Sequence, residues 1–231
     1  NNPPVEPDLW LCPSKLDYNI LKEEGRNVEY LPIPIDRTKI PFRLRRKAET
    51  FVFNNGHGGS IGRNSAREMI EAISRVKIGA KFIVRSQVPI DNMLNDGKTK
   101  FILGESKKED LYSEGDILVF PHKFDGLSLP IQEAMAAGMP IITTDFFPHN
   151  EYLPKELLFK PDDIGKAKLC EECREIDLHF IYPRLLAEKI EEIAFKDITE
   201  LSLQMNRQAE EWSWDTLKKN YQELLLRVCG K

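Results

Sequence analysis

From residue 50 onward, short apolar runs alternate with segments whose apolar residues recur at helical spacing. The apolar runs predict buried strands at 50–55, 80–86, 116–121 and 139–145. The helical spacing predicts helices at 64–76, 107–115, 129–138 and 184–195. Strands that alternate with helices in this way are typical of parallel βαβ units. The pattern therefore predicts an α/β fold built on a doubly wound parallel sheet, in which ligands bind beyond the carboxyl ends of the strands.

A separate strand, helix and strand unit precedes this alternation. Its elements are an apolar run at 8–14, helical spacing at 15–25 and an extended run at 27–36 that prolines interrupt. Residues 37–49 then lose the apolar period and become polar and basic, which is typical of a linker. We therefore place a domain boundary in this segment.

Composition favours a protein that binds small molecules or other proteins. The 231 residues are 41% apolar and 30% charged, which is enough for a sizeable core. A net charge of −4 does not supply the dominant basic surface that nucleic acids attract. The sequence has no signal-peptide pattern and no apolar stretch of about 18 residues, and its four cysteines suggest no disulfide framework. We therefore expect a cytoplasmic protein that does not bind nucleic acid.

The stretch "DGLSLPIQE", residues 125–133, places two carboxylates around the start of one predicted helix. Pro130 is favourable at the first helical position, and Gly138 is suited to end the helix. The Glu133 side chain then leans back toward the helix start, where Asp125 approaches from the preceding loop. These acids either bind a ligand or are ordinary acids of a helix start, because the helix dipole favours acids there even where no ligand binds.

The same helix start offers a site for an anion. The backbone N–H groups of Leu127, Ser128 and Leu129, with the positive end of the helix dipole, suit a phosphate. Gly126 lets the chain turn tightly and a ligand come close. Carboxylates repel a phosphate in direct contact, so their useful partners are neutral hydroxyls on either side of it. A ligand that carries hydroxyls at both ends of a phosphate is a nucleotide sugar.

The stretch "DILVFPHKFDGLSLPIQEAMAAGMPIITTD" resembles the donor-binding segment of retaining GT-B glycosyltransferases of family 4. That segment has an Asp-strand-Pro run, an acid-Gly turn, a Glu eight residues after the acid, and a Gly-x-Pro end. The corresponding residues here are Asp116, Pro121, Asp125, Gly126, Glu133, Gly138 and Pro140. Similarity continues in "HNEYLP", which contains Glu151, and in "EEWSWDTLKKNYQELL". The resemblance thus extends from about residue 28 to the end.

The resemblance implies a Rossmann-like GT-B donor domain behind a remnant of an acceptor-binding N-terminal domain. Residues 1–36 would be the last strand, helix and strand of that otherwise absent domain, and residues 37–50 a linker. The donor-binding domain would cover 51–211, with an acidic insertion near 162–181. A closing helix would occupy 212–231.

By position, the resemblance also implies roles for individual residues. Glu133 would bind the ribose diol of the nucleotide, and Asp125 would hold hydroxyls of the transferred sugar. Arg63 is the best candidate for the diphosphate, since a guanidinium can pair with two phosphate oxygens and neutralise a leaving group. A surface arginine is the alternative for that position. Asp125 and Arg63 would then be the catalytic residues.

Further donor-binding candidates lie on the loop "GHGGSIGRN" and near two strand ends. Single matches of this kind are weak, because a lone histidine or a strand-end arginine is often structural or solvated. The candidates are His57, Gly58, Gly59, Asn64, Arg85 and His122. The sequence departs from the family pattern at three positions. Family members usually have Glu at the position of Asp125, often Gly at that of Ser128 and usually Lys at or next to that of Asn64. These departures make catalysis less certain than donor binding.

The predicted function is transfer of a hexose, with retention, from a nucleotide-diphosphate sugar to a hydroxyl acceptor on a glycan, lipid or protein-linked sugar. No cofactor is expected, and no metal, since no DxD-like acidic pair is present. The alternative is a non-catalytic module, derived from such an enzyme, that binds nucleotide sugars or serves as an interaction module. An oxidoreductase is disfavoured because no strand is followed by a G-x-G-x-x-G helix start.

Two remaining motifs add little to this prediction. Cys170 and Cys173 have zinc-like spacing, but a structural site needs four ligands and no second pair follows. The basic run at 42–47 suits contact with a membrane or a polyanionic acceptor, or simply a solvated linker.

Overall fold

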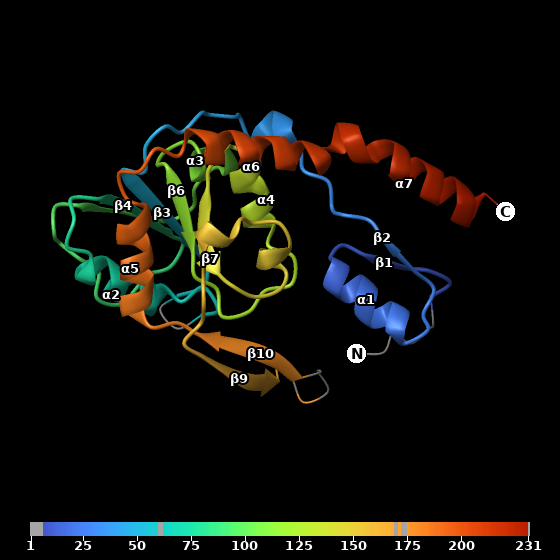
Figure 1. Cartoon of the computed structure of the whole chain (residues 1–231), viewed down its shortest axis with the longest axis horizontal. Helices are drawn as coiled ribbons and strands as arrows, with labels where there is room; N and C mark the ends of the chain where they lie inside the picture. The colour runs from blue at the N-terminus through green and yellow to red at the C-terminus, as the bar shows by residue number, and fades with distance from the viewer. Residues whose placement is uncertain (1–6, 60–61, 169–170, 172–174, 231) are drawn as a thin grey trace.

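The centre of the molecule is a six-stranded parallel sheet (Figure 1), seen in a computed structural model that describes residues 7–59, 62–168, 171 and 175–230. Along the sheet the strands follow the order β5-β4-β3-β6-β7-β8, and every neighbouring pair is parallel. The strands are β3 (Thr50–Gly56), β4 (Lys81–Ser86), β5 (Thr99–Leu103), β6 (Ile117–Phe120), β7 (Ile141–Thr144) and β8 (Leu158–Phe159).

Helices cover both faces of this sheet. Helix α2 (Ala66–Arg75) packs against α5 (Pro183–Ile193), and α4 (Leu129–Ala136) packs against α6 (Thr199–Glu211). The steps from β3 to β4 and from β6 to β7 run in opposite directions along the sheet, so right-handed crossovers place α2 and α4 on opposite faces. Strands β6 and β7 are buried throughout, β6 as an unbroken apolar run and β7 with two buried threonines after its two isoleucines. The predicted doubly wound α/β fold is confirmed.

A small unit precedes the main sheet. Strands β1 (Trp10–Cys12) and β2 (Val28–Tyr30) pair in parallel, and α1 (Lys15–Glu23) connects them. The Ser14 side chain begins α1 by accepting a hydrogen bond from the Asp17 amide. In Figure 1 this unit lies beside the main body, and the C-terminal helix α7 (Trp214–Cys229) extends away above it. The segment between the unit and the body runs past the start of α7, where the Ile35 amide donates to the Trp212 carbonyl at 2.8 Å.

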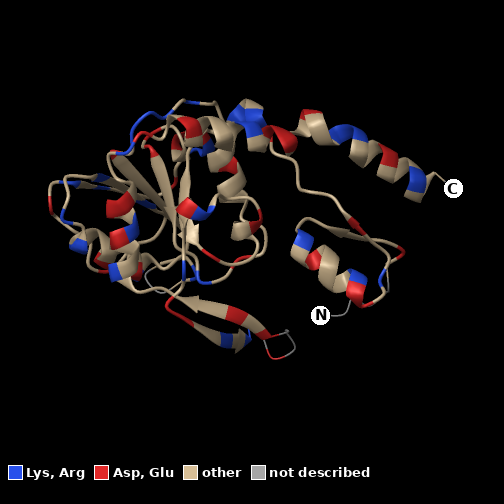
Figure 2. Ribbon diagram, viewed as in Figure 1, with Lys and Arg blue, Asp and Glu red and all other residues tan. Residues whose placement is uncertain are grey.

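The segment predicted as an acidic insertion forms an antiparallel hairpin of β9 (Asp163–Lys168) and β10 (Glu175–Phe180). Helix α6, strand β8 and the short helices α3 (Lys108–Leu111), η1 (Arg37–Lys39), η2 (His149–Glu151) and η3 (Lys155–Leu157) complete the fold. Charges of both signs are spread over the outer helices (Figure 2). None of the helices in the described part of the chain is long and apolar enough to cross a membrane.

The basic run at 42–47 is tied to the body at the amino ends of β3 and β6. Arg45 is 1% exposed and donates to the Tyr112 carbonyl at 2.5 Å and to the Ala137 carbonyl. Arg43 donates to the Gly115 carbonyl, and Lys47 pairs with a neighbouring glutamate at 2.7 Å. Arg43 and Arg45 thus fasten the linker to the edge of the sheet opposite the carboxyl ends of its strands, whereas Lys47 pairs within the linker.

Candidate functional site

The loops that follow β3 and β6 meet at the carboxyl edge of the sheet. These strands are neighbours at the point where the strand order reverses, which is where ligands bind in open α/β sheets. The Lys123 amide donates to the Arg63 carbonyl at 2.8 Å, so the two loops are joined through their backbones. The Arg63 Nη1 atom also lies 3.3 Å from Asp125 Oδ1. The structure thus brings together Arg63 and Asp125, which are distant in sequence and were both candidates.

Asp125 is surrounded by hydrogen-bond donors, and its side chain is only 6% exposed. On Oδ2 it accepts from Ser128 Oγ at 2.6 Å and from His122 Nδ1 at 3.0 Å. On Oδ1 it accepts from its neighbour's amide, Gly126 N, at 2.8 Å, and from Arg63. The carboxylate is therefore held on both oxygens.

Two buried histidines stand behind this carboxylate. The His122 ring stacks on Phe120 with ring centroids 3.6 Å apart. His149 Nδ1 lies 2.8 Å from Thr143 Oγ1, and its Nε2 atom lies 2.6 Å from Ser128 Oγ. His149 was not a candidate, although its position just after a buried strand at the same sheet edge was visible in the sequence.

Burial and hydrogen bonding set the charges of this cluster in opposite ways. Burial raises the pKa of Asp125, but the hydrogen bonds from His122 and Ser128 and the nearby His149 ring, 3.6 Å away, outweigh it and hold the pKa well below its ordinary value. Burial lowers the pKa of both His122 and His149, and the neighbouring Asp125 offsets this only in part. At neutral pH an ionised carboxylate thus sits among neutral histidines.

The predicted helix start is where the sequence places it. Ser128 is the N-cap of α4 with a left-handed φ of 62°, and Pro130 lies in the first turn. Gly138, with φ 68°, follows the end of the helix. The amides of Leu127, Ser128 and Leu129 lie at this N-terminus, where the first N–H groups of a helix have no acceptor within it. Tyr152 steadies the turn by donating to the Leu127 carbonyl at 3.2 Å.

Glu133 lies one turn inside α4 and is 16% exposed. Its Oε2 atom accepts from the Tyr112 hydroxyl at 2.8 Å, and its Oε1 atom pairs with Lys108 Nζ at 2.6 Å. Burial, and then the Glu133 charge, raise the pKa of Tyr112, so the hydroxyl stays a donor. Tyr112 and Lys108 were not predicted, because nothing in the sequence pairs the short helix α3 with α4.

The glycine-rich loop after β3 is packed against itself. Asn64 donates to the Asn55 carbonyl, and Asn55 donates to the Gly59 carbonyl at 3.1 Å. A Cβ atom at Gly58 would lie 2.7 Å from Asn64 Nδ2, so a side chain there would displace the asparagines that hold this turn together. His57 is exposed on the same loop. The loop candidates therefore share one compact turn beside Arg63.

Three other residues lie apart from these loops or outside the described residues. Arg85, at the end of β4, is 4% exposed and pairs with Glu114 at 3.1 Å, which ties β4 to the loop before β6. Cys170 and Cys173 fall outside the described residues. Among the residues that are described, no group of three His, Cys, Asp or Glu side chains is arranged to hold a metal ion.

A cavity of about 1030 Å³ opens in front of Arg63, Asp125 and Gly126. Its other walls are β1 and α1 of the N-terminal unit, the loop after β7 and the β9–β10 hairpin. The hairpin is tied to the site because the His179 amide donates to the Lys123 carbonyl at 2.8 Å. The cavity thus has room for a ligand between the loops, the small unit and the hairpin.

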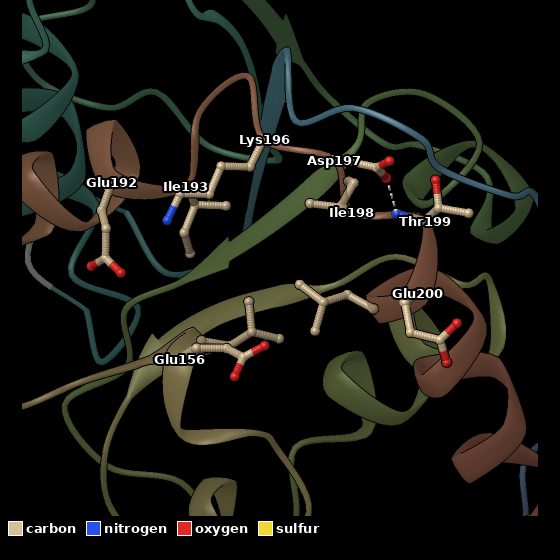
Figure 3. A pocket seen from close by; sticks show the side chains of 10 residues that line it. Glu156, Glu192, Ile193, Lys196, Asp197, Ile198, Thr199 and Glu200 are labelled. Atoms are coloured by element: carbon tan, nitrogen blue, oxygen red, sulfur yellow. Dashed lines mark hydrogen bonds between the residues drawn. The ribbon is translucent and has the colours of Figure 1, made fainter.

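A second pocket, of about 520 Å³, shares no lining residue with the first (Figure 3). Several acidic side chains, among them Glu156 and Glu192, border it near the start of α6. Asp197 there accepts a hydrogen bond from the Thr199 amide at 2.8 Å, as at an ordinary helix start. This pocket lies apart from the candidate residues.

The family model described as "Glycosyl transferases group 1" matches residues 57–176, more than half of the chain. The chain belongs to this family. The match includes both site loops, Asp125 and Glu133, and it agrees with the resemblance seen in the sequence. No curated protein matches this group 1 chain in sequence.

Solved structures share the fold at low sequence identity. Sucrose-phosphate synthase from Thermosynechococcus elongatus aligns with a TM-score of 0.67 and 15% identity over 98% of this chain and 60% of its own. Anabaena HepE in complex with UDP-glucose aligns at 0.64 and 12% identity, over 96% and 64% of the two chains. The pneumococcal O-GlcNAc transferase GtfA in complex with UDP and GlcNAc aligns at 0.61 and 13%, over 97% and 46%. The group 1 chain thus spans about half to two thirds of the length of these proteins.

Proposed function

We propose that this chain carries the donor site of a retaining glycosyltransferase, which moves a hexose from a nucleotide-diphosphate sugar to a hydroxyl acceptor on a glycan, lipid or protein-linked sugar. The main support is the meeting of Arg63 and Asp125 at one wall of a 1030 Å³ cavity in a group 1 chain, with the start of α4 directly after Asp125 in the same loop. HepE and GtfA, which share this fold, were crystallised with UDP-glucose and with UDP and GlcNAc.

Each part of the donor has a proposed partner. The diphosphate meets Arg63 and the amides of Leu127–Leu129, where positive charge and free N–H groups favour an anion. The ribose diol meets Glu133, which Tyr112 holds in place. The loop of His57, Gly58, Gly59 and Asn64 borders the phosphates, and His122 acts from a buried position behind Asp125, whereas Arg85 lies apart and supports the sheet through Glu114.

The proposed chemistry needs only charges that are already in place. The bond between the anomeric carbon and the diphosphate oxygen breaks, and the acceptor oxygen forms a bond to that carbon on the same face. The proton of the acceptor hydroxyl passes to the departing diphosphate oxygen. Arg63 and the helix start stabilise the negative charge on the leaving group, because they are oriented before the reaction begins. We propose no metal and no further cofactor in these steps.

The acceptor is proposed to bind opposite the donor, toward the side of the cavity formed by the β1–α1–β2 unit. Residues 1–36 are proposed to be part of an acceptor domain, residues 51–211 the donor domain and residues 212–231 a closing helix. A membrane contact through the basic run at 42–47 has less support, because Arg43, Arg45 and Lys47 are bonded within the chain.

A non-catalytic nucleotide-sugar module is the second candidate. The observation that favours it is the burial of Asp125, whose carboxylate already bonds to four donors of its own chain. Such a module would bind the donor without turning it over.

Transfer distinguishes the two candidates. The chain is joined to the acceptor domain of a fold relative and incubated with UDP-glucose, and free UDP is measured with and without a mixture of sugar acceptors. We expect acceptor-dependent release of UDP, reduced at least about tenfold by Arg63→Gln, since a charge-assisted bond to the leaving group is lost. Saturable binding of UDP-glucose with no release of UDP would favour the module.

A further inference from the structure

We propose that Asp125 is a positioning residue, which holds the Arg63 guanidinium toward the cavity, and that Arg63, not Asp125, contacts the donor. This inference rests on the proposed function, and it changes the role that the position of Asp125 in the family motif implies. It is based on which groups occupy the hydrogen-bond acceptor sites of the Asp125 carboxylate.

A carboxylate offers about four lone-pair sites, two on each oxygen. Asp125 fills them with four donors of its own chain, at 2.6 to 3.3 Å: Ser128 Oγ and His122 Nδ1 on Oδ2, and Gly126 N and Arg63 Nη1 on Oδ1. A sugar hydroxyl could bond to this carboxylate only by displacing one of them. The side chain in this structure is therefore saturated.

The four donors differ in how easily they could leave. His122 and Ser128 are 3% and 4% exposed, and Ser128 is held in turn by His149 at 2.6 Å. Displacing His122 would take the buried Nδ1 atom away from its Asp125 partner, and displacing Ser128 would disturb the hydroxyl that also contacts His149, and loss of a buried hydrogen bond is costly. The Gly126 amide is held by the same backbone turn that carries Asp125. Arg63 is 50% exposed and is the one partner whose donor is an exposed side chain.

Arg63 can hold Asp125 and a ligand at the same time. A guanidinium has five N–H donors in a planar fork, and the bond to Asp125 is made through Nη1. Its backbone is fixed too, because the Arg63 carbonyl accepts from the Lys123 amide at 2.8 Å. Both Arg63 and Asp125 line the 1030 Å³ cavity. An arginine fixed at both ends in this way can present its remaining donors to the oxygens of a diphosphate.

The two possible roles of Asp125 make opposite predictions for ligands without a sugar. If Asp125 holds a sugar hydroxyl, removing its carboxylate weakens the binding of the nucleotide sugar and leaves the binding of the nucleoside diphosphate unchanged. If Asp125 positions Arg63 for the diphosphate, removing its carboxylate weakens the binding of both ligands by the same factor. In a variant that already lacks Arg63, removing the carboxylate has no further effect on affinity.

The test is a double-mutant cycle read by calorimetry on the full chain. UDP, UDP-glucose, GDP and GDP-mannose are titrated into the wild type, Asp125→Asn, Arg63→Gln and the double variant. We expect each single variant to weaken UDP and UDP-glucose, or GDP and GDP-mannose, by the same factor of about ten or more. We expect the double variant to bind no more weakly than Arg63→Gln. Asp215→Asn, on α7 away from the cavity, is the control for losing one negative charge.

Three outcomes would overturn a part of this account. If Asp125→Asn weakens the binding of the nucleotide sugars only, the positioning role is contradicted. It is also contradicted if the affinity of the double variant falls by the product of the two single-variant factors. A wild type that binds none of the four ligands contradicts the proposed function itself. If Asp125→Asn does not fold, Ser128→Ala replaces it, since it removes one bond to Oδ2 and keeps the charge. The same equal weakening is then expected, and a loss limited to the nucleotide sugars contradicts the inference.

Discussion

At the scale of single residues, the site depends on how a buried charge is stabilised. Asp125 stays ionised because hydrogen bonds from its neighbours outweigh the effect of burial on its pKa. His122 and His149 are buried and stay neutral, and the groups that face them are Asp125, Arg63 and His179. This cluster fixes the loop after β6, and with it the position of Arg63.

This arrangement predicts that acid destabilises the fold. Burial lowers the pKa of His122 and His149 in the folded state, so the unfolded chain takes up more protons once the pH falls below about 6.5. The free energy of unfolding should then decrease with falling pH, by at most about 1.4 kcal/mol per pH unit for each histidine. Asp125, whose pKa is also lowered, adds to the loss only below about pH 4.

Urea unfolding at several pH values between 7.5 and 5 measures this effect. The variant His122→Asn should show a smaller slope than the wild type, whereas His57→Asn, which changes an exposed histidine, should keep the wild-type slope. A wild-type stability that is constant from pH 7.5 to 5 would show that the histidines are not held neutral.

The sequence revealed some residues of the site and not others, for a physical reason. Asp125, Gly126 and Glu133 could be found because one helix start brings them together through local spacing. Tyr112 and Lys108 could not, because their contact with Glu133 depends on how α3 docks against α4. The sequence also could not show that the Asp125 carboxylate is saturated, since one of its four donors, Arg63, comes from the loop after β3, which only the folded sheet brings next to the loop after β6.

At the scale of elements, tight turns decide where the strands of the site begin. Gly115 precedes β6 with φ 77°, and a Cβ atom there would lie 2.1 Å from Val52 Cγ2, in the buried strand β3. The close approach of this turn to β3 leaves no room for a side chain. Strand β6 carries the loop of Asp125 at its other end, so the turn contributes to the placement of the site.

Replacing Gly115 by alanine should therefore destabilise the protein more than an equivalent change elsewhere. Gly25→Ala is the matched control, since Gly25 has nearly the same φ, 76°, and no atom within 4 Å of an added Cβ. We expect Gly25→Ala to cost about 1 to 2 kcal/mol through its backbone conformation, and Gly115→Ala a further 1 to 3 kcal/mol through overpacking. Equal losses in urea unfolding would mean that the contact with Val52 relaxes freely.

Most elements were predicted from periodicity, and the exceptions have identifiable causes. Helix α4 has both of its end signals in the sequence, Pro130 and Gly138, and it was found within a residue or two. Helix α6 was missed because its sequence is largely polar and only Ser202, Met205 and Ala209 are buried. The hairpin of β9 and β10 was missed because its strands are mostly exposed and pair only with each other.

At the scale of the whole molecule, the cavity lies between parts that are far apart in the chain. The Glu151 carboxylate, beside the site, accepts from the Leu16 amide at 3.2 Å at the start of α1, which ties the small N-terminal unit to the main body. Arg45 fastens the linker between them to the opposite edge of the sheet. The chain spans 60% of the sucrose-phosphate synthase that it resembles in fold. Donor binding is thus the property to measure on this chain.

The most direct test of the central claim is calorimetric titration of the chain with UDP-, GDP- and ADP-hexoses and with the matching nucleotides, repeated on Glu133→Gln. We expect saturable binding to one nucleotide family. Glu133→Gln should weaken the binding of the nucleotide and of the nucleotide sugar alike by about tenfold or more, because a charge-assisted bond to the ribose is lost. Glu156→Gln, at the second pocket of Figure 3, should bind like the wild type. No binding of any donor, or binding that Glu133→Gln leaves unchanged, would contradict the account.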